Sequence, residues 1–183
     1  MSIRLGKDAV MYVGGSYDVN GVLSDQCQLV NSVDPQTWNM TPAAWNEVCE
    51  VKDVTINAQL SLADVTDRCS AQGWRLQVGT LADGTIDTSM NYDTDSDGYD
   101  YFQNAYFNRD VIIVAIMDRD AKALPGATTA EGLIAPMQVT NFSINQPLED
   151  AITVDVQLTL TRLTCTGSPV FPQWVNNFDL TLP

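Results

Sequence analysis

Two-residue alternation over three segments constrains the fold of this chain more than any other feature. In residues 53–62 the even positions are apolar and the odd positions are polar. The same pattern, in the same phase, recurs over 85–92, where Thr88 is the one polar residue on the apolar side, and over 152–160. Because successive side chains of a strand point to opposite faces, each segment predicts a strand with one dry and one wet face. Three such strands predict an antiparallel sheet solvated on one side.

Other segments add strands to this sheet. Residues 111–117 (VIIVAIM) are apolar throughout and predict a strand covered on both faces. Weaker strand patterns occupy 9–13, 76–80 and 133–139. Pro136 lies in the last of these and predicts an edge position or a bulge there, because proline cannot donate a ladder hydrogen bond.

The period changes after Gly98. Tyr99, Phe102, Ala105 and Tyr106 fall on one helical face, with polar residues opposite them. This pattern predicts a single short helix packed on the sheet.

Together the patterns predict a mainly β fold, an antiparallel β-sandwich or half-barrel with one short helix. The length predicts a single domain over residues 1–183, long enough to bury a sizeable core. Two regions lack regular patterns, and we interpret them as an irregular insertion at about 16–46 and a C-terminal extension at about 163–183.

The charge balance excludes ordinary nucleic-acid binding. The chain has 9 Lys and Arg residues against 23 Asp and Glu residues, a formal net charge of -14 and a pI near 4.1. Such a surface repels phosphate instead of releasing counterions from it. Repulsion is still useful to a protein that DNA must pass without sticking.

The absence of histidine removes most familiar active sites. The sequence contains no histidine, so a Ser-His-Asp triad, a Cys-His pair and a histidine-ligated zinc cannot form. It also lacks the glycine-rich motifs that bind nucleotide phosphates. We therefore expect no enzyme activity and no cofactor. A hydrolase based on two carboxylates stays open, because the sequence does not say which carboxylates face each other.

Four cysteines, at positions 27, 49, 69 and 165, are widely spaced and form no metal-binding pair. No segment is apolar enough for a signal peptide or a membrane span, so we expect cytosolic synthesis and no membrane insertion. A reducing compartment disfavours disulfides, and we therefore expect buried free thiols.

The four tryptophans, Trp38, Trp45, Trp74 and Trp174, fall outside the predicted core strands. They are either interface anchors or residues that pack loops onto the subunit's own body.

Residues 91–104 (NYDTDSDGYDYFQN) contain an acidic cluster. Asp93, Asp95, Asp97 and Gly98 match the opening of an EF-hand calcium loop, but Asn104 stands where that loop needs a bidentate glutamate. The alternative needs no metal, because acidic residues favour the N-terminus of a helix, and Asp97 is placed as its N-cap. A calcium-dependent binding module is thus the alternative function.

Six segments follow one another in a recognisable order: LGKDAVMYVGG (5–15), VKDVTINAQLSLADVTDR (51–68), GWR (73–75), AYFNRD (105–110), VIIVAIMD (111–118) and VTNFSINQPLEDAITVDVQLTLT (139–161). Taken together, they resemble the tail tube, or major tail, proteins of long-tailed bacteriophages and gene transfer particles. None of these segments is a catalytic signature. The insertion and the extension depart from the compact pattern of that family.

The resemblance implies a structural protein of the virion tail, assembled in the host cytoplasm. It implies rings, usually hexameric, that stack into a hollow tube through which DNA passes, and partners such as the tape measure and tail terminator proteins. It also implies that a loop between two strands reaches the next ring. The matching segment here is 62–74, and the candidate contact residues are Asp64, Asp67, Arg68 and Trp74.

The wet strand faces supply candidates for a lumen lining, because they carry carboxylates, amides and hydroxyls but no Lys or Arg. These candidates are Asp53, Asn57, Asp87, Asp155 and Thr159. A lumen lined in this way repels the DNA backbone over about 8 Å at physiological salt. The alternative is an ordinary solvated sheet face.

Overall fold

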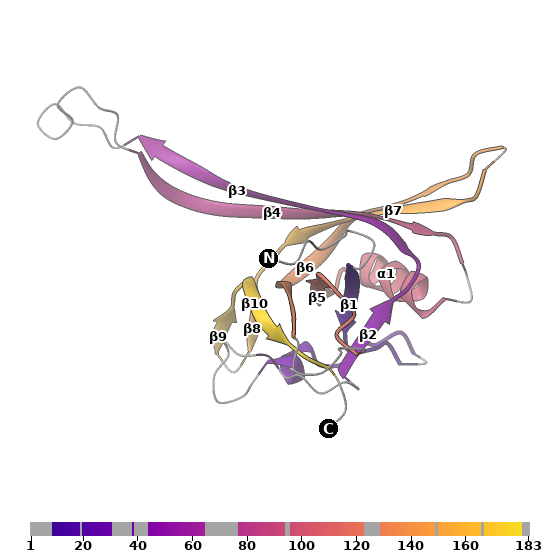
Figure 1. The fold of residues 1–183 in the computed structure, drawn as a ribbon, viewed down its shortest axis with the longest axis horizontal. Helices are drawn as coiled ribbons and strands as arrows, with labels where there is room; N and C mark the ends of the chain where they lie inside the picture. The colour runs from indigo at the N-terminus through magenta and orange to yellow at the C-terminus, as the bar shows by residue number, and fades with distance from the viewer. Residues whose placement is uncertain are drawn as a thin grey trace, which may run out of the picture.

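An eight-stranded antiparallel sheet dominates the structure (Figure 1). The computed structural model describes residues 9–18, 20–30, 38, 44–64, 77–93, 96–122, 129–148, 150–165 and 167–180. The elements are β1 (Val10–Gly14), η2 (Gln26–Leu29), β2 (Trp45–Val48), β3 (Val51–Asp64), β4 (Gln77–Asn91), α1 (Asp97–Asn108), β5 (Val111–Met117), β6 (Ala130–Asn145), β7 (Thr153–Leu160), β8 (Leu163–Cys165), β9 (Ser168–Val170) and β10 (Gln173–Phe178). The predicted class, mainly antiparallel β with one α-helix, is confirmed.

The sheet folds into two layers at β6. The strand order is β2-β1-β5-β6-β7-β4-β3, and β10 also pairs with β6. The first half of β6 pairs with β5 and β10. β6 pairs with β7 from Met137 to Asn145, with a register shift between Val139 and Asn141. We call β3, β4, β7 and the second half of β6 the long-strand layer. The remaining strands form the body layer beneath it (Figure 1).

The predicted central strand is β5, and it is covered on both faces. Ile112, Val114 and Ile116 enter the core between the two layers, which also contains Ile86 and Leu158 of the long-strand layer. The alternate residues of β5 enter a second core on the outer face of the body layer. Two-sided burial explains why this strand reads as a continuous apolar run.

Pro136 lies inside β6 and not at a sheet edge, so that part of the prediction is wrong. The Pro136 carbonyl accepts a hydrogen bond from Thr161 N, just beyond the end of β7 at Leu160. In an antiparallel strand the N and C=O of one residue point to the same side. The missing N–H therefore faces the end of a neighbouring strand, where it removes no ladder bond.

Helix α1 closes one side of the core, as predicted, with Tyr99, Phe102 and Ala105 buried. Its N-cap is Ser96 and not Asp97: Ser96 Oγ accepts hydrogen bonds from the backbone N–H groups of Gly98 and Tyr99. Asp97 is the first helical residue, where a negative charge still favours the positive end of the helix dipole.

The insertion and the extension meet on the outer face of the body layer. Cys27 of η2 and Cys165 of β8 form a disulfide, with their Cα atoms 5.4 Å apart. The expectation that these two residues are free thiols is therefore wrong, because tertiary packing brings together two residues 138 positions apart. Cys49 is free but exposed, which also departs from the expected burial. Cys69 lies outside the described residues.

The tryptophans divide between the two expected roles. Trp45 begins β2 and is fully buried against Phe178, so its predicted place outside the core strands is wrong. Trp38 is buried in the second core, and its indole N–H donates to Gln173 Oε1. Trp174 lies on β10 and is 69% exposed, which leaves it as the interface candidate. Trp74 lies outside the described residues.

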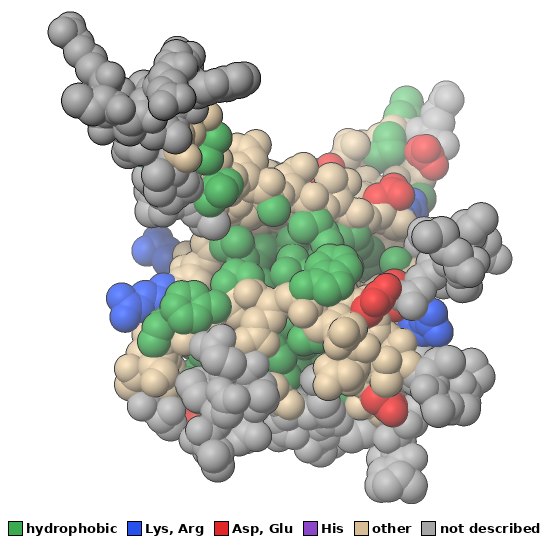
Figure 2. All heavy atoms as spheres, turned by 60° about the vertical axis from the view of Figure 1, so that its left-hand side comes forward, with side chains coloured by type: hydrophobic (Ala, Val, Ile, Leu, Met, Phe, Trp, Pro, Cys, Tyr) green, Lys and Arg blue, Asp and Glu red, His purple; other side chains and the backbone are tan. Residues whose placement is uncertain are grey.

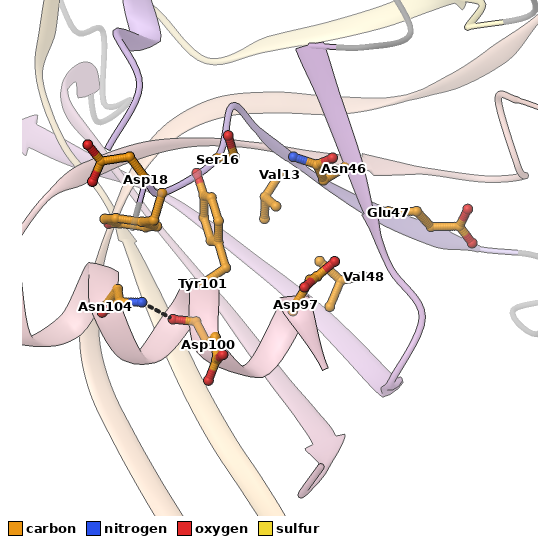
Figure 3. Close-up of a pocket in the computed structure, with 12 residues that line it drawn as sticks. Val13, Ser16, Asp18, Asn46, Glu47, Val48, Asp97, Asp100, Tyr101 and Asn104 are labelled. Carbon is orange, nitrogen blue, oxygen red and sulfur yellow. Dashed lines mark hydrogen bonds between the residues drawn. The ribbon is translucent and has the colours of Figure 1, made fainter. Parts of the chain in front are cut away.

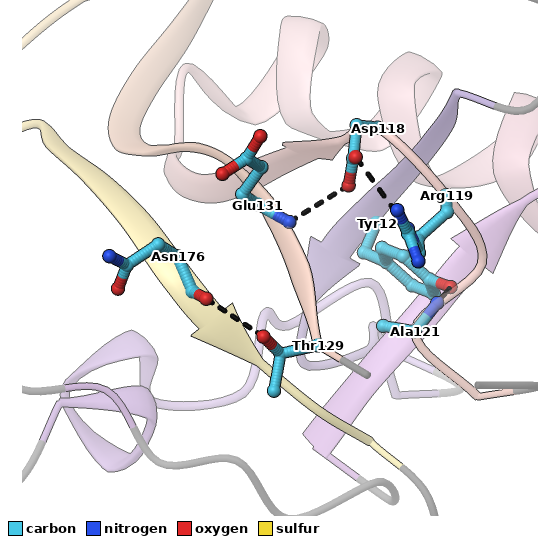
Figure 4. A network of polar contacts seen from close by, with 7 residues as sticks. All are labelled: Tyr12, Asp118, Arg119, Ala121, Thr129, Glu131 and Asn176. Carbon is cyan, nitrogen blue, oxygen red and sulfur yellow. Dashed lines mark hydrogen bonds and ion pairs between the residues drawn. The ribbon is translucent and has the colours of Figure 1, made fainter. Parts of the chain in front are cut away.

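Tyr12 connects the second core to the turn after β5 (Figure 4). Its fully buried hydroxyl donates to Asp120 Oδ1 at 2.7 Å and accepts from the Ala121 N–H at 2.8 Å. At the same turn, Asp118 Oδ1 accepts from the Glu131 N–H at 2.8 Å. These bonds tie the end of β5 to β1 and to the start of β6.

Buried tyrosines make the fold sensitive to high pH. Burial, and then the hydrogen bond to Asp120, raise the pKa of Tyr12 above its ordinary value near 10. Burial, and then the nearby Asp110 charge, do the same to the pKa of Tyr101, whose hydroxyl donates to Gly14 O at 2.7 Å. Both phenols therefore stay neutral in the folded state when the unfolded chain has already ionised.

We expect the free energy of unfolding to be insensitive to these two tyrosines below about pH 10 and to fall above it, by roughly 1.4 kcal/mol per pH unit for each one. Urea unfolding measured from pH 8 to pH 11 checks this slope. Tyr101→Phe should lose some stability at every pH, through its hydrogen bond to Gly14, but should show a shallower decline above pH 10. An unchanged slope in that variant would contradict the assignment.

Candidate functional site

Polar side chains cover the outer face of the long-strand layer in three transverse rows. Cross-strand partners share a face of a sheet, so the pairing register defines each row. From β3 through β4 and β7 to β6, the rows are Asp53-Ser89-Asp155-Ser143, Thr55-Asp87-Gln157-Asn141 and Asn57-Thr85-Thr159-Gln138. We call this surface the polar face. All five residues predicted as lumen candidates lie on it.

Hydrogen bonds between strands hold the centre of the polar face. Asp87 accepts from Asn57 Nδ2 at 3.0 Å through one carboxylate oxygen and from Gln157 Nε2 at 2.7 Å through the other. The Thr140 and Thr159 hydroxyl oxygens lie 3.0 Å apart, within hydrogen-bonding distance. The two bonds to the Asp87 carboxylate are charge-assisted, and such bonds are stronger than neutral ones. The Asp87 carboxylate is therefore fixed between two amides from β3 and β7.

Carboxylates are the charged groups of this surface. Asp53 and Asp155 are exposed members of the first row, and Asp87 is a half-buried member of the second. The pair Gln59 and Asp83 continues the face toward the free end of β3 and β4. No member of the three rows or of this pair is Lys or Arg. Asp83 was not predicted as a lumen candidate, because the predicted strand began at residue 85. Asp83 is nevertheless in phase with the alternation of that strand.

The opposite face of the layer is apolar but is only partly covered in the single chain. Ile86, Val156 and Leu158 are buried there, as is Thr88, whose hydroxyl has no hydrogen-bond partner. On the free part of β3, the side chains at 56, 60 and 62 are 39%, 60% and 55% exposed. The prediction that this side of β3 is dry is therefore wrong for the isolated subunit beyond Val54.

The long-strand layer ends in two free strand edges. β3 pairs with β4, and no described strand pairs with its other side. β5 pairs with β6 as far as Gln138, so the same side of β6 has no described strand partner over residues 139–145. An unpaired edge presents N–H and C=O groups that another chain can bind by strand addition.

Comparison with known proteins identifies the family to which this chain belongs. The family described as phage tail tube protein matches residues 36–163. The chain belongs to this family. Membership makes this tail tube protein a structural component of the virion tail. A search of curated proteins by sequence gave no significant match.

Solved structures of two tails and of one baseplate share the fold at low sequence identity. A chain from the tail of an empty gene transfer agent particle, computed with C6 symmetry, superposes with a TM-score of 0.59 at 14% identity, covering 92% of this chain and 98% of that one. A chain of the SPP1 tail tube gives 0.58 at 11% identity, with 97% and 82% covered. A chain of the anti-feeding prophage baseplate gives 0.53 at 7% identity, with 100% of both covered.

The predicted stacking loop is only partly described in this tail tube protein. Asp64 is the last residue of β3, where it pairs with Gln77, so the strand runs further than the sequence pattern indicates. Asp67, Arg68 and Trp74 lie outside the described residues.

The acidic cluster gains no support as a calcium site. Among the described residues, no group of three or more Asp, Glu or Cys side chains is arranged to hold a metal ion. Asp97 lines a hollow of about 340 Å³, and Figure 3 shows its other carboxylates, Asp18, Glu47 and Asp100, spread around the rim instead of converging. Asp93 does not line this hollow, and Asp95 lies outside the described residues.

No helix within the described ranges could span a membrane: none combines the length and the apolar character that a span needs.

Proposed function

We propose that this tail tube protein forms closed rings by pairing the β3 edge of each copy with the β6 edge of the next. The observation that carries the proposal is the geometry of the two free edges. They lie on opposite sides of a four-strand segment in which every neighbour is antiparallel. Three antiparallel steps make β3 and β6 run in opposite directions. A head-to-tail copy therefore continues the antiparallel pattern, and rotation about one axis closes it.

Six copies per ring fit the symmetry given for the gene transfer agent tail, and stacked rings make a tube. In this arrangement the polar face lines the lumen, since the apolar face packs against the body layer. The lumen candidates Asp53, Asn57, Asp87, Asp155 and Thr159 would then face the passing DNA. Their carboxylates repel phosphate, and their neutral partners offer DNA no fixed cation to bind.

The proposal extends to the setting of the tube. Subunits assemble in the host cytoplasm, and the tube contacts a tape measure protein and a tail terminator protein. DNA passes through the lumen without sequence-specific contacts. The chain acts as a conduit and carries out no chemistry, in keeping with the absence of histidine from the sequence.

Electron microscopy of the purified protein tests assembly. We expect rings or tubes at high concentration, or after seeding with sheared tails of the phage that carries the protein, and we expect them to survive a calcium chelator. Projection averages of the rings should show sixfold symmetry. Protein that stays monomeric under all of these conditions would sink the proposal.

A further inference from the structure

An apolar groove of about 490 Å³ runs beneath the free part of β3 and β4. Its upper wall is the apolar face of the long-strand layer, including Ile56 and Leu60. Its lower wall comes from the body layer and the β9–β10 connection, including Leu133, Met137 and Phe171. Figure 2 shows hydrophobic side chains gathered in this hollow between the two layers.

The groove belongs to a larger exposed apolar surface. Leu60 and Phe171 are 60% and 54% exposed. Leu133, at the floor of the groove, pairs across strands with Trp174, which is 69% exposed. Isolated apolar residues at a protein surface need no explanation, but a contiguous patch with a hollow marks a binding surface.

The opposite end of the long-strand layer carries a matching apolar tip. The hairpin between β6 and β7 projects beyond the body on the side away from the groove (Figure 1). On this hairpin Ile144 is 41% exposed and Leu148 is 99% exposed. The tip and the groove lie at opposite ends of the same sheet, so the tip does not fill the groove of its own chain.

We propose that the groove of one subunit receives the β6–β7 hairpin tip of a second copy of the same chain, with Leu148 seated between the two layers. This inference rests on the proposed tube assembly. It adds a contact made along the strand direction, in contrast to the strand pairing that closes a ring. A contact between two different patches on identical copies is head-to-tail and repeats along the assembly.

Charge complementarity supports the same occupant. In the sequence, Glu149 and Asp150 follow Leu148 directly, and Asp150 is exposed. Arg162 is also exposed and comes two residues after Leu160, which lines the groove. One of the chain's 9 basic residues is therefore two residues from a groove-lining leucine, near which the acidic tip would dock, and among the described residues Asp83 is the one charged residue that lines the groove itself. The pairing of Arg162 with the acidic tip would favour this orientation of the hairpin.

Cysteine cross-linking of assembled protein tests the contact. Leu60→Cys and Leu148→Cys are combined in a Cys49→Ser, Cys69→Ser background that keeps the Cys27–Cys165 bond, and molecular oxygen with a copper catalyst is the oxidant. We expect a ladder of covalent multimers on a non-reducing gel. The matched control replaces Leu148→Cys with Phe107→Cys, at a side chain 70% exposed on α1, and should stay monomeric.

A second variant separates this inference from the proposed function. Leu148→Asp should leave rings intact and shorten tubes severalfold, and Phe107→Asp should leave tube length unchanged. Normal tubes from Leu148→Asp, or tubes of the double-cysteine protein that give no ladder, would overturn the hairpin contact while leaving tube formation standing. Wild-type protein that forms neither rings nor tubes would overturn both.

Discussion

Phage particles whose tail tube protein carries Asp53→Lys are expected to eject their DNA about tenfold more slowly, or slower still, at low ionic strength. One lysine near an anionic surface contributes about 1 kcal/mol, and about 1.4 kcal/mol corresponds to a factor of ten in rate. Each substitution changes the subunit charge by about two, and a ring repeats that change in every copy. A few simultaneous contacts with the DNA backbone are therefore enough to slow its passage.

Asp53 suits this test because it lies away from the hydrogen bonds that organise the polar face. It is exposed on β3, whereas Asp87 is held by Asn57 and Gln157. Changing Asp53 should therefore leave the fold and tube assembly intact. Asp155→Lys, from the same transverse row, should repeat the effect.

Two comparisons isolate the cause of slower ejection. Asp53→Asn removes a negative charge without adding a positive one and should give an intermediate rate. Asp100→Lys makes the same change in net charge on an exposed position of α1, outside the polar face, and should leave the rate unchanged. The difference between Asp53→Lys and wild type should shrink as salt shortens the Debye length. Equal ejection rates for Asp53→Lys and wild type at low salt would remove the lumen assignment.

Strand positions and faces could be predicted from the sequence because period-2 alternation depends on local geometry alone. Residues 53–62 lie in β3, and residues 85–92 and 152–160 coincide with parts of β4 and β7 except for Tyr92 and Ile152, with the predicted phase. The full extent of the strands could not be predicted. β3 and β4 pair over Leu60 and Leu62 through a register shift, and Gly79 and Gly84 interrupt the alternation in β4. Bulges and glycines break a sequence pattern without breaking the strand.

The apolar side of β3 shows that apolar/polar alternation can reflect burial in an assembly and not only burial within one chain. Alternation predicted a dry face, but Leu60 and Leu62 are exposed in the isolated chain. A residue is selected for the environment that it has in the working assembly. The exposed half of this face is therefore consistent with burial against another copy. The pattern alone could not say whether the covering surface belongs to the same chain.

Sheet order could not be predicted from strand patterns. The polar rows depend on β4 lying between β3 and β7, and β7 is separated from β4 in the sequence by α1, β5 and β6. The two free edges depend on where β5 stops along β6. These are properties of long-range packing, and a single sequence carries no local signal for them. The family resemblance supplied the ring hypothesis, and the sheet order identifies the strand edges that could form it.

Removing the bond between Cys27 and Cys165 is expected to lower the free energy of unfolding by roughly 2–5 kcal/mol. The bond closes a loop across 138 positions, for which the chain-entropy model gives about 5 kcal/mol as an upper value. It joins the insertion to the C-terminal extension on the outer face of the body layer. For a chain of this length, a loss of about 3 kcal/mol lowers Tm by roughly 6–12 °C.

Calorimetry with and without a phosphine reductant measures this loss. The Cys27→Ser, Cys165→Ser variant should match the reduced wild type and should not respond to the reductant. Cys49→Ser should keep the full Tm, since that thiol is free. Mass spectrometry of unreduced peptides should recover Cys27 linked to Cys165. A Tm that is the same in oxidised and reduced wild type would contradict a stabilising bond.

The Cys27–Cys165 bond links the stability of the subunit to the proposed assembly of the tube in the host and its later release. The cytosol keeps thiols reduced, and the extracellular medium allows disulfides to form. Subunits assembled in a host cytoplasm would therefore enter the tube with both thiols free. The other side chains of the second core would hold this region together before the bridge forms. Oxidation after release would then raise the stability of a subunit that is already in place. Tails purified from lysates under reducing conditions should accordingly dissociate at a lower temperature than tails exposed to air, and the Cys27→Ser, Cys165→Ser tails should show no such difference.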